Sequence, residues 1–220
     1  MGKHHDPVVV IGLGRFGSAL ALELGRRGTD VLAIDSRQAI VQRLAGQLSQ
    51  VVVADATDID ALGSLGVADF RRAVIAIGTD RQASILAAAT VADLGVEDIW
   101  AKALDAQHAR ILERVGAHHV VQPEHEMGER VAHLVSGRML DWLEVDERWV
   151  MAKTRPPKSL VGTPLGETKL RAKHKVTIVA VKPQHSTAFT HAGTDTVLTY
   201  GDQIVVGGHP DDVERFVELL

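Results

Sequence analysis

Hydrophobic and polar positions along the first half of the chain form a pattern typical of strands and helices in alternation. Between Pro7 and about Pro123, short apolar runs recur, and segments with helical spacing of apolar residues lie between them. The clearest such helix is expected at Arg81–Leu94. Strands are expected at Val8–Ile11, Val31–Ile34, Val51–Ala54, Ala73–Ile77, Ile99–Lys102 and His119–Val121. This alternation predicts an α/β fold with a doubly wound parallel sheet.

The pattern changes after Pro123. Glu126–Leu140 has apolar residues toward one side, which predicts a longer crossover helix, and Asp211–Leu220 has the pattern of an amphipathic helix. A short helix can begin within Gly162–Leu165. Strand-like segments of a small α+β lobe are expected at Trp142–Lys153, Val176–Lys182, Thr196–Leu198 and Gln203–Val206. We place the domain boundary near residue 140, so that residues 1–140 form the first domain and residues 141–220 the second.

A glycine motif follows the first expected strand. Gly12, Gly14 and Gly17 form G-x-G-x-x-G, and Asp35 ends the next strand. In this pattern the first glycine allows a tight turn, the second lets backbone approach a pyrophosphate, and the third lets the helix pack closely on the strand. The helix, which ends at Gly28, directs free N–H groups at an anion, and the carboxylate can accept from ribose hydroxyls. The motif therefore predicts a nucleotide site in preference to a glycine turn that binds nothing.

Other polar residues follow later strands at the same carboxyl edge of the sheet, where ligands of open α/β sheets bind. Asp55–Thr57 could face an adenine or ribose, or Asp55 and Thr57 could simply cap the next helix. Gly78 and Thr79 are expected to line the nucleotide, with helix capping as the alternative.

The fifth and sixth expected strands bring a cation and a carboxylate toward this edge. Lys102 could bind a phosphate, and Glu124 could hold a divalent ion beside it. A solvated lysine and a glutamate at a helix N-terminus are the alternatives, because neither position is specific by itself.

Composition narrows the classes of protein and partner. The chain has 220 residues, enough for one large or two small domains. Its formal net charge is −4, so no basic excess points to nucleic acid as a partner. It has no cysteine, which excludes disulfides, thiolate metal sites and a cysteine nucleophile. Since no segment reaches the roughly 18 apolar residues needed to span a bilayer, a soluble cytoplasmic protein is expected.

The remaining residues do not predict a catalytic or metal-binding constellation. The 11 histidines include His118 and His119, but adjacent residues of a strand point to opposite faces, and no H-x-x-x-H spacing occurs. There is no G-x-S-x-G motif and no Tyr-x-x-x-Lys pairing, since Tyr200 is the only tyrosine. Binding without turnover is therefore preferred to an enzymatic activity.

Two sets of segments, taken together, are far more specific than the glycines alone. Those in the first half are Val10–Gly17, Ile34-Asp35, Ala54–Thr57, Ser84–Ala87, Ala101–Ala103 and Gly116–Glu124. Those in the second half are Leu170–His174, Val176–Lys182 and Tyr200–Gly208. With them the chain resembles, over nearly its whole length, the RCK (regulator of potassium conductance) family and its Ktr/Trk-type potassium-uptake regulatory subunits. The resemblance implies a Rossmann-type sheet, a crossover helix and a small C-terminal RCK lobe.

The resemblance also implies that the first lobe binds ATP, ADP or NAD(H) as a regulatory ligand. Arg15 would reach phosphate across the site or from a neighbouring subunit, and Glu124 would hold Mg²⁺ or Ca²⁺ shared with ATP. The implied nucleotide contacts are Gly12, Gly14, Arg15, Phe16, Gly17, Asp35, Ser36, Asp55, Ala56, Thr57, Gly78, Thr79, Lys102 and Glu124. Of these, the glycines and Asp35 are also supported by the motif itself.

Partners and a second ligand are implied as well. Subunits would pair and assemble into a ring, expected to be octameric, on an integral membrane potassium transporter at the inner face of the cell membrane. Some family members bind cyclic di-AMP between two C-terminal lobes. The corresponding residues here are Arg171, Lys173, His174, Ile178 and Val179.

Two other functions stay open from the residues. One is an NAD(P)-dependent oxidoreductase, in which Arg37 is available to a 2′-phosphate although Asp35 would repel it. The other is a stand-alone nucleotide sensor with no membrane partner.

Overall fold

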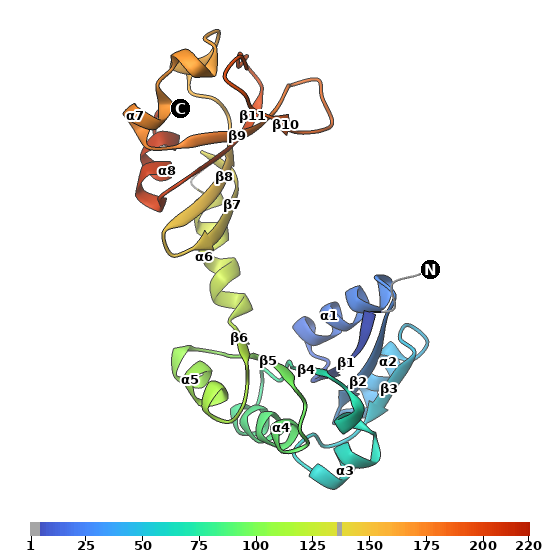
Figure 1. The fold of residues 1–220 in the computed structure, drawn as a ribbon. Helices are drawn as coiled ribbons and strands as arrows, with labels where there is room; N and C mark the ends of the chain where they lie inside the picture. The colour runs from blue at the N-terminus through green and yellow to red at the C-terminus, as the bar shows by residue number, and fades with distance from the viewer. Residues whose placement is uncertain (1–4, 136–137) are drawn as a thin grey trace. The chain divides into compact units, whose positions relative to one another are not determined.

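The computed structural model describes residues 5–135 and 138–220. The chain divides into two compact units, the first ending at Glu124 and the second beginning at His125 (Figure 1). This division lies near the start of helix α6 (Pro123–Val135), whereas the boundary expected from the sequence lies after the helix. The assignment of this helix to the first domain stays a prediction.

The described residues of the first unit contain a six-stranded sheet in the order β3-β2-β1-β4-β5-β6. All of its pairings are parallel, which confirms the predicted fold class. Each predicted strand is present; the sixth has the predicted bounds, and the others have one or both ends shifted, as in the fourth, which ends at Ile75. The strands are β1 His5–Ile11, β2 Thr29–Asp35, β3 Gln50–Val53, β4 Arg72–Ile75, β5 Asp98–Lys102 and β6 His119–Val121.

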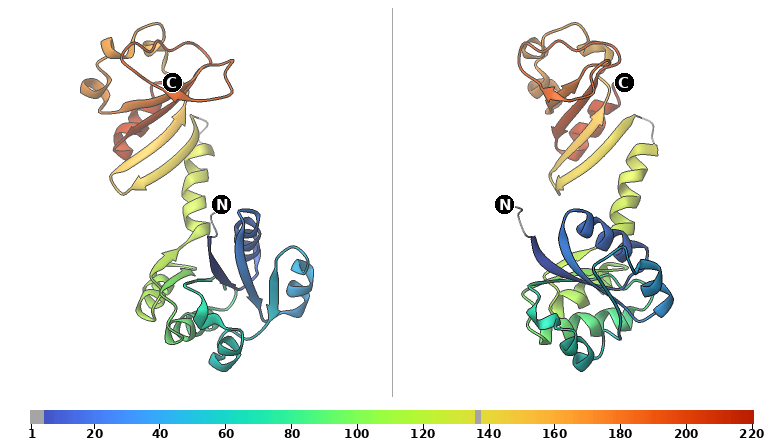
Figure 2. Two further views of the ribbon diagram at one scale, coloured as in Figure 1. Left: turned by 45° about the vertical axis from the view of Figure 1, so that its right-hand side comes forward. Right: turned by 90° about the vertical axis from the view of Figure 1, so that its right-hand side faces the viewer.

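Helices cover both faces of this sheet, as the two views in Figure 2 show. The helices of this unit are α1 Arg15–Arg26, α2 Gln38–Leu44, α3 Ile59–Ser64, the 3₁₀ turn η1 Val67–Asp69, α4 Arg81–Asp93 and α5 Ala106–Arg114. Successive side chains of β1 point to opposite faces, so Val8 and Val10 pack in one core while Val9 and Ile11 pack in the other. Burial on both sides explains why the strand is continuously apolar.

The second unit contains an antiparallel sheet in the order β10-β9-β11-β8-β7. Its strands are β7 Met139–Asp146, β8 Trp149–Thr154, β9 Thr177–Lys182, β10 Thr190–His191 and β11 Gln203–Gly208. Its helices besides α6 are η2 Lys158–Leu160, η3 Leu165–Glu167, α7 Leu170–His174 and α8 Pro210–Val217. Val213 and Phe216 of α8 join the buried core under this sheet. The predicted α+β lobe is therefore present.

Three predictions in this unit were wrong in detail. Leu140, placed in the crossover helix, lies in β7, because α6 ends at Val135; residues 136–137 of that predicted helix lie outside the described residues. The predicted single strand Trp142–Lys153 is the greater part of a hairpin, in which the carboxylate of Asp146 accepts from the Arg148 N–H across the turn at 2.7 Å.

The third concerns Thr196–Leu198, predicted as a strand. Val197 and Leu198 form only isolated bridges, to Pro164 and Val161, and so tie two loops together outside the sheet. Proline cannot donate to a strand ladder, which limits the pairing there.

Within the part of the chain that the structure describes, none of the helices is both long and apolar enough to cross a bilayer.

Candidate functional site

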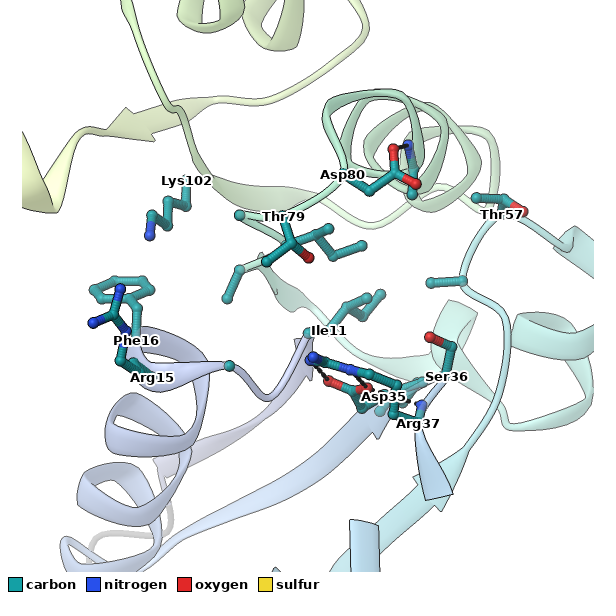
Figure 3. Close-up of a pocket in the computed structure, with 18 of the residues that line it drawn as sticks. Ile11, Arg15, Phe16, Asp35, Ser36, Arg37, Thr57, Thr79, Asp80 and Lys102 are labelled. Atoms are coloured by element: carbon teal, nitrogen blue, oxygen red, sulfur yellow. Dashed lines mark hydrogen bonds and ion pairs between the residues drawn. The ribbon is translucent and has the colours of Figure 1, made fainter. Parts of the chain in front are cut away.

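A cavity of about 530 Å³ lies in the first unit, at the carboxyl ends of the parallel strands (Figure 3). Every implied nucleotide contact except Gly17 lines this cavity. Figure 3 shows Arg15, Phe16 and Lys102 at one end, and Asp35, Arg37 and their neighbours at the other. Strands β1 and β4 are neighbours in the sheet, and the loops after them lead to opposite faces of the sheet. Ligands of open α/β sheets bind at such a point, where the two loops diverge.

The glycines of the motif have different tasks in the structure. Gly12 has a φ of +90°, and a Cβ built there would lie 2.9 Å from the backbone nitrogen of Ile77. A Cβ at Gly17 would lie only 1.9 Å from the carbonyl oxygen of Gly12, so this glycine allows helix α1 to pack on the loop. A Cβ at Gly14 would meet no described heavy atom within 4 Å. Gly14 is therefore the position where added bulk would enter the cavity without disturbing the fold.

Helix α1 begins at the floor of the cavity with Gly14 as its N-cap. The first N–H groups of a helix have no intrahelical acceptor, and the helix dipole places positive potential there. Arg15, in the first turn, lines the cavity and is exposed. This end of the cavity therefore suits an anionic group such as phosphate.

Asp35, at the end of β2, is buried and accepts hydrogen bonds from two loops, the one after β1 and the one after β2. The N–H of Leu13 donates to its carboxylate at 2.7 Å, and the backbone N–H of Arg37 donates at 2.9 Å. The Arg37 guanidinium donates to both oxygens, at 3.0 and 3.1 Å. Burial by itself would raise the pKa of Asp35, but the hydrogen bonds from Arg37 and Leu13 outweigh burial and hold the pKa below its ordinary value.

Lys102, at the end of β5, is buried while its partner is exposed. Its side chain is 8% exposed and pairs with Glu124, which is 65% exposed. The ammonium also lies 5.8 Å from the centre of the Phe16 ring, and a Cβ on Gly78 would come within 3.2 Å of it. The hydrogen bond from Lys102 lowers the pKa of Glu124. The alternative of a solvated lysine is therefore wrong, because the chain encloses this cation at the wall of the cavity.

In both polar segments a different residue caps the following helix, so the capping alternatives for Asp55, Thr57, Gly78 and Thr79 are wrong. The N-cap of α3 is Asp58, whose carboxylate accepts from two helix N–H groups; Asp55 instead accepts from the N–H and hydroxyl of Thr57 within its own turn. The N-cap of α4 is Asp80, while Gly78 and Thr79 line the cavity. Ala83 and Leu104 line it too. Neither was predicted, because neither belongs to a motif.

A metal centre built by the protein alone is not present among the described residues, since no group of three or more His, Cys, Asp and Glu side chains comes together there. Glu124 is a single carboxylate at the cavity wall. One carboxylate fits a cation that takes its other ligands from nucleotide phosphates and water, as Mg²⁺ commonly does.

The residues expected to meet cyclic di-AMP lie on α7 and β9 of the second unit. Arg171, Lys173 and Val179 are exposed, and the Arg171 guanidinium donates to the Thr177 hydroxyl at 3.0 Å. Ile178 is buried in the hydrophobic core instead, so its side chain serves packing. His174 is partly buried, with its ring 5.9 Å from that of Phe216 in an edge-to-face contact.

Comparison with known proteins finds one domain family in each of the two units of the chain. Residues 8–123 match the TrkA-N domain family, and residues 151–220 match the TrkA-C domain family. Ktr system potassium uptake protein C of Bacillus subtilis is 36% identical over 208 residues, covering 94% of each chain. Ktr system potassium uptake protein A of Vibrio alginolyticus is 36% identical over 212 residues, covering 96% of each.

Solved structures show the same fold. The RCK domain of GsuK has a TM-score of 0.67 at 18% identity; the match covers 99% of this chain, which spans about half (48%) of the GsuK chain. The TrkA-N domain of the Escherichia coli inner membrane protein ybaL has a TM-score of 0.54, also at 18% identity, and covers 61% of this chain and 99% of its own. The chain thus belongs to the TrkA-N/TrkA-C family of RCK-domain proteins, of the Ktr/Trk potassium-uptake type.

Proposed function

We propose that this chain is a nucleotide-binding regulatory subunit of a membrane potassium-uptake transporter. The observation that carries the proposal is the cavity of the first unit, with an anion-accepting helix terminus at one end and the buried carboxylate of Asp35 at the other. The relatives named potassium uptake proteins support the transporter as the partner, because they match the chain over nearly its whole length.

The nucleotide would lie across the cavity in a definite direction. Its phosphates would meet the Gly12–Gly14 loop and the first N–H groups of α1. Arg15 and Lys102 would add positive charge at the same end of the cavity. Its ribose would meet Asp35, with Ser36 and Asp55–Thr57 nearby. ATP, ADP and NAD(H) share this arrangement of phosphate and ribose, and the solved GsuK channel of similar fold is a complex with NAD.

Glu124 would add a cation to the triphosphate. Its exposed carboxylate lines the cavity and is the group that would hold Mg²⁺ or Ca²⁺, and such an ion would supply positive charge to a bound triphosphate. ADP lacks the terminal phosphate, and this gives the two nucleotides different contacts at the same end of the cavity.

A difference in contacts is what a regulatory switch requires. A ligand shifts an equilibrium between two shapes only by its difference in affinity for them. We propose that ATP and ADP stabilise different arrangements of paired subunits in a ring, and that the ring transmits the difference to the transporter at the inner face of the membrane. In this role the chain would bind the nucleotide without turning it over, and nucleic acid would not be a partner.

A second ligand, cyclic di-AMP, would act on the second unit. The exposed side chains of Arg171, Lys173 and Val179, with His174 beside them, are the groups that could contact it. Ile178 would support the site from the core.

Calorimetric titration with ATP, ADP, NADH and cyclic di-AMP tests the nucleotide site. We expect adenine nucleotides to bind the wild-type protein and to bind Asp35→Ala at least about tenfold more weakly, since hydrogen bonds to a charged acceptor contribute about 1.5–3 kcal/mol. Binding of cyclic di-AMP is expected to be the same in both proteins. Equal binding of adenine nucleotides to both would place the ligand elsewhere and contradict the proposal.

The regulatory role needs a separate experiment with the transporter. We expect co-purification with an integral membrane potassium transporter, and different transport rates with ATP and with ADP in reconstituted vesicles. A stand-alone sensor would not co-purify, and an oxidoreductase would instead oxidise NADH with some member of a substrate panel.

A further inference from the structure

The carboxylate of Asp35 is already saturated by donors of its own chain. A carboxylate offers about four lone-pair positions. Among the described residues, four N–H groups donate to it: the backbone groups of Leu13 and Arg37, and two groups of the Arg37 guanidinium. A ribose hydroxyl can therefore reach Asp35 only if some of these bonds break.

The four donors differ in how easily they can leave. The N–H groups of Leu13 and Arg37 are fixed by the backbone, and that of Leu13 lies in the glycine loop beside the equally fixed Gly12, whose N–H donates to the carbonyl of Ile34. The Arg37 side chain is 53% exposed, while that of Asp35 is 3% exposed. Rotation of the guanidinium into solvent frees two acceptor positions without moving the backbone. Figure 3 shows the guanidinium lying over the carboxylate within the cavity.

We propose that Arg37 is a selectivity residue of the nucleotide site, whose guanidinium competes with the ribose hydroxyls of a bound nucleotide for the carboxylate of Asp35. The inference rests on the proposed nucleotide site. Nucleotides with a free ribose lose affinity because they must displace an ion pair before they bind.

The displaced guanidinium of Arg37 would also lie where it could meet a 2′-phosphate. The other cations that line the described cavity, Arg15 and Lys102, lie at the opposite end. Arg37 is thus the cation beside the ribose, where a 2′-phosphate would lie. A 2′-phosphate offers the guanidinium a bidentate partner in exchange for Asp35. Arg37 therefore disfavours NADH and partly offsets the repulsion between Asp35 and NADPH.

Titration of NADH and NADPH into wild type and Arg37→Ala tests the inference. We expect Arg37→Ala to bind NADH about three- to tenfold more tightly, because a half-exposed ion pair no longer has to break. NADPH is expected to gain nothing or to lose affinity, so the preference for NADH rises. Arg43→Ala is the matched control: Arg43 belongs to the same helix region but does not line the cavity, and its loss is expected to change neither affinity.

The double variant separates competition from a general effect of charge. In an Asp35→Asn background Arg37 has no carboxylate to hold, so Arg37→Ala is expected to give no further gain for NADH. Unchanged or weaker NADH binding by Arg37→Ala alone would overturn the inference and leave the nucleotide site intact. Failure of wild type and all variants to bind ATP, ADP, NADH or NADPH would overturn the proposed function and the inference together.

Discussion

Lys102 and Glu124 form a pair of unequal exposure at the cavity wall. Burial of the Lys102 ammonium costs solvation free energy. The hydrogen bond from Lys102 to Glu124 and the nearby Phe16 ring partly offset this cost. An enclosed cation with one exposed partner is well suited to bind a phosphate, because the ligand meets a charge that is poorly screened by water. We therefore expect the pair to contribute to ligand binding more than to stability.

The Lys102→Met variant tests this assignment. Methionine keeps the apolar stem and removes the charge, so we expect nucleotide affinity to fall about tenfold or more, with the thermal unfolding midpoint unchanged or raised. Lys158→Met, in the second unit, is the control and is expected to bind as wild type does. Calorimetry and a thermal melt measure both effects. Equal nucleotide affinities in the two variants would contradict a role for Lys102.

Asp35 contributes stability that depends on pH. Its pKa is lowered in the folded state, so the carboxylate stabilises the fold above its unfolded pKa of about 3.9, and this stabilisation is lost as pH falls through the lower folded value. We expect wild type to exceed Asp35→Asn in stability at pH 7, and the gap to narrow below about pH 4. Urea unfolding of both proteins across this range measures the gap, and a gap that widens in acid would be the wrong sign.

At the scale of elements, the glycine motif around the start of α1 separates two effects that both depend on glycine. Gly17 faces backbone, and Gly14 faces open space. Gly17 thus allows the helix to pack tightly on the loop, and Gly14 leaves the helix terminus open to a ligand.

Two alanine variants distinguish these effects. Gly17→Ala is expected to lower the free energy of unfolding by about 1–3 kcal/mol or more, because its Cβ overlaps the Gly12 carbonyl. Gly14→Ala has an ordinary φ of −67° and is expected to change stability by less than about 0.5 kcal/mol while weakening nucleotide binding. Urea unfolding and calorimetry are run on both. Undiminished binding by Gly14→Ala would mean that the phosphates do not pass this residue.

Local patterns were less reliable for the elements of the second unit. The hairpin of β7 and β8 was predicted as one strand, because its two-residue turn, Glu147 and Arg148, has no glycine, proline or asparagine to mark it. The turn is held by the Asp146 side chain instead. Thr196–Leu198 has strand composition, yet its neighbours are loops, and composition does not reveal neighbours.

At the scale of the whole molecule, the described residues form separate hydrophobic cores in the two units. Ile75 is buried in a core of the first unit, and Ile204 is buried in that of the second. Each unit can therefore lose packing while the core of the other stays complete.

Matched cavities in the two units test this separation. Ile204→Ala and Ile75→Ala are each expected to cost about 2–5 kcal/mol locally. Hydrogen exchange is expected to rise in β8, β9 and β11 for the first variant, with nucleotide affinity retained, and in β1, β4 and β5 for the second, with affinity lost. A rise spread equally over both units in either variant would contradict separate cores.

The sequence by itself determined the parallel sheet and the place of the candidate nucleotide site. Both follow from local signals: apolar runs of strand length, and the glycines with Asp35 at fixed spacing, whose effects act within one strand–helix–strand unit. The tertiary structure alone decided which side chains of the candidate sites are free to meet a ligand. Asp35 is saturated by Arg37 and Leu13, Lys102 is enclosed against Glu124, and Ile178 is turned into the core. These properties depend on what packs beside each side chain, and one strand's pattern carries no information about its neighbours.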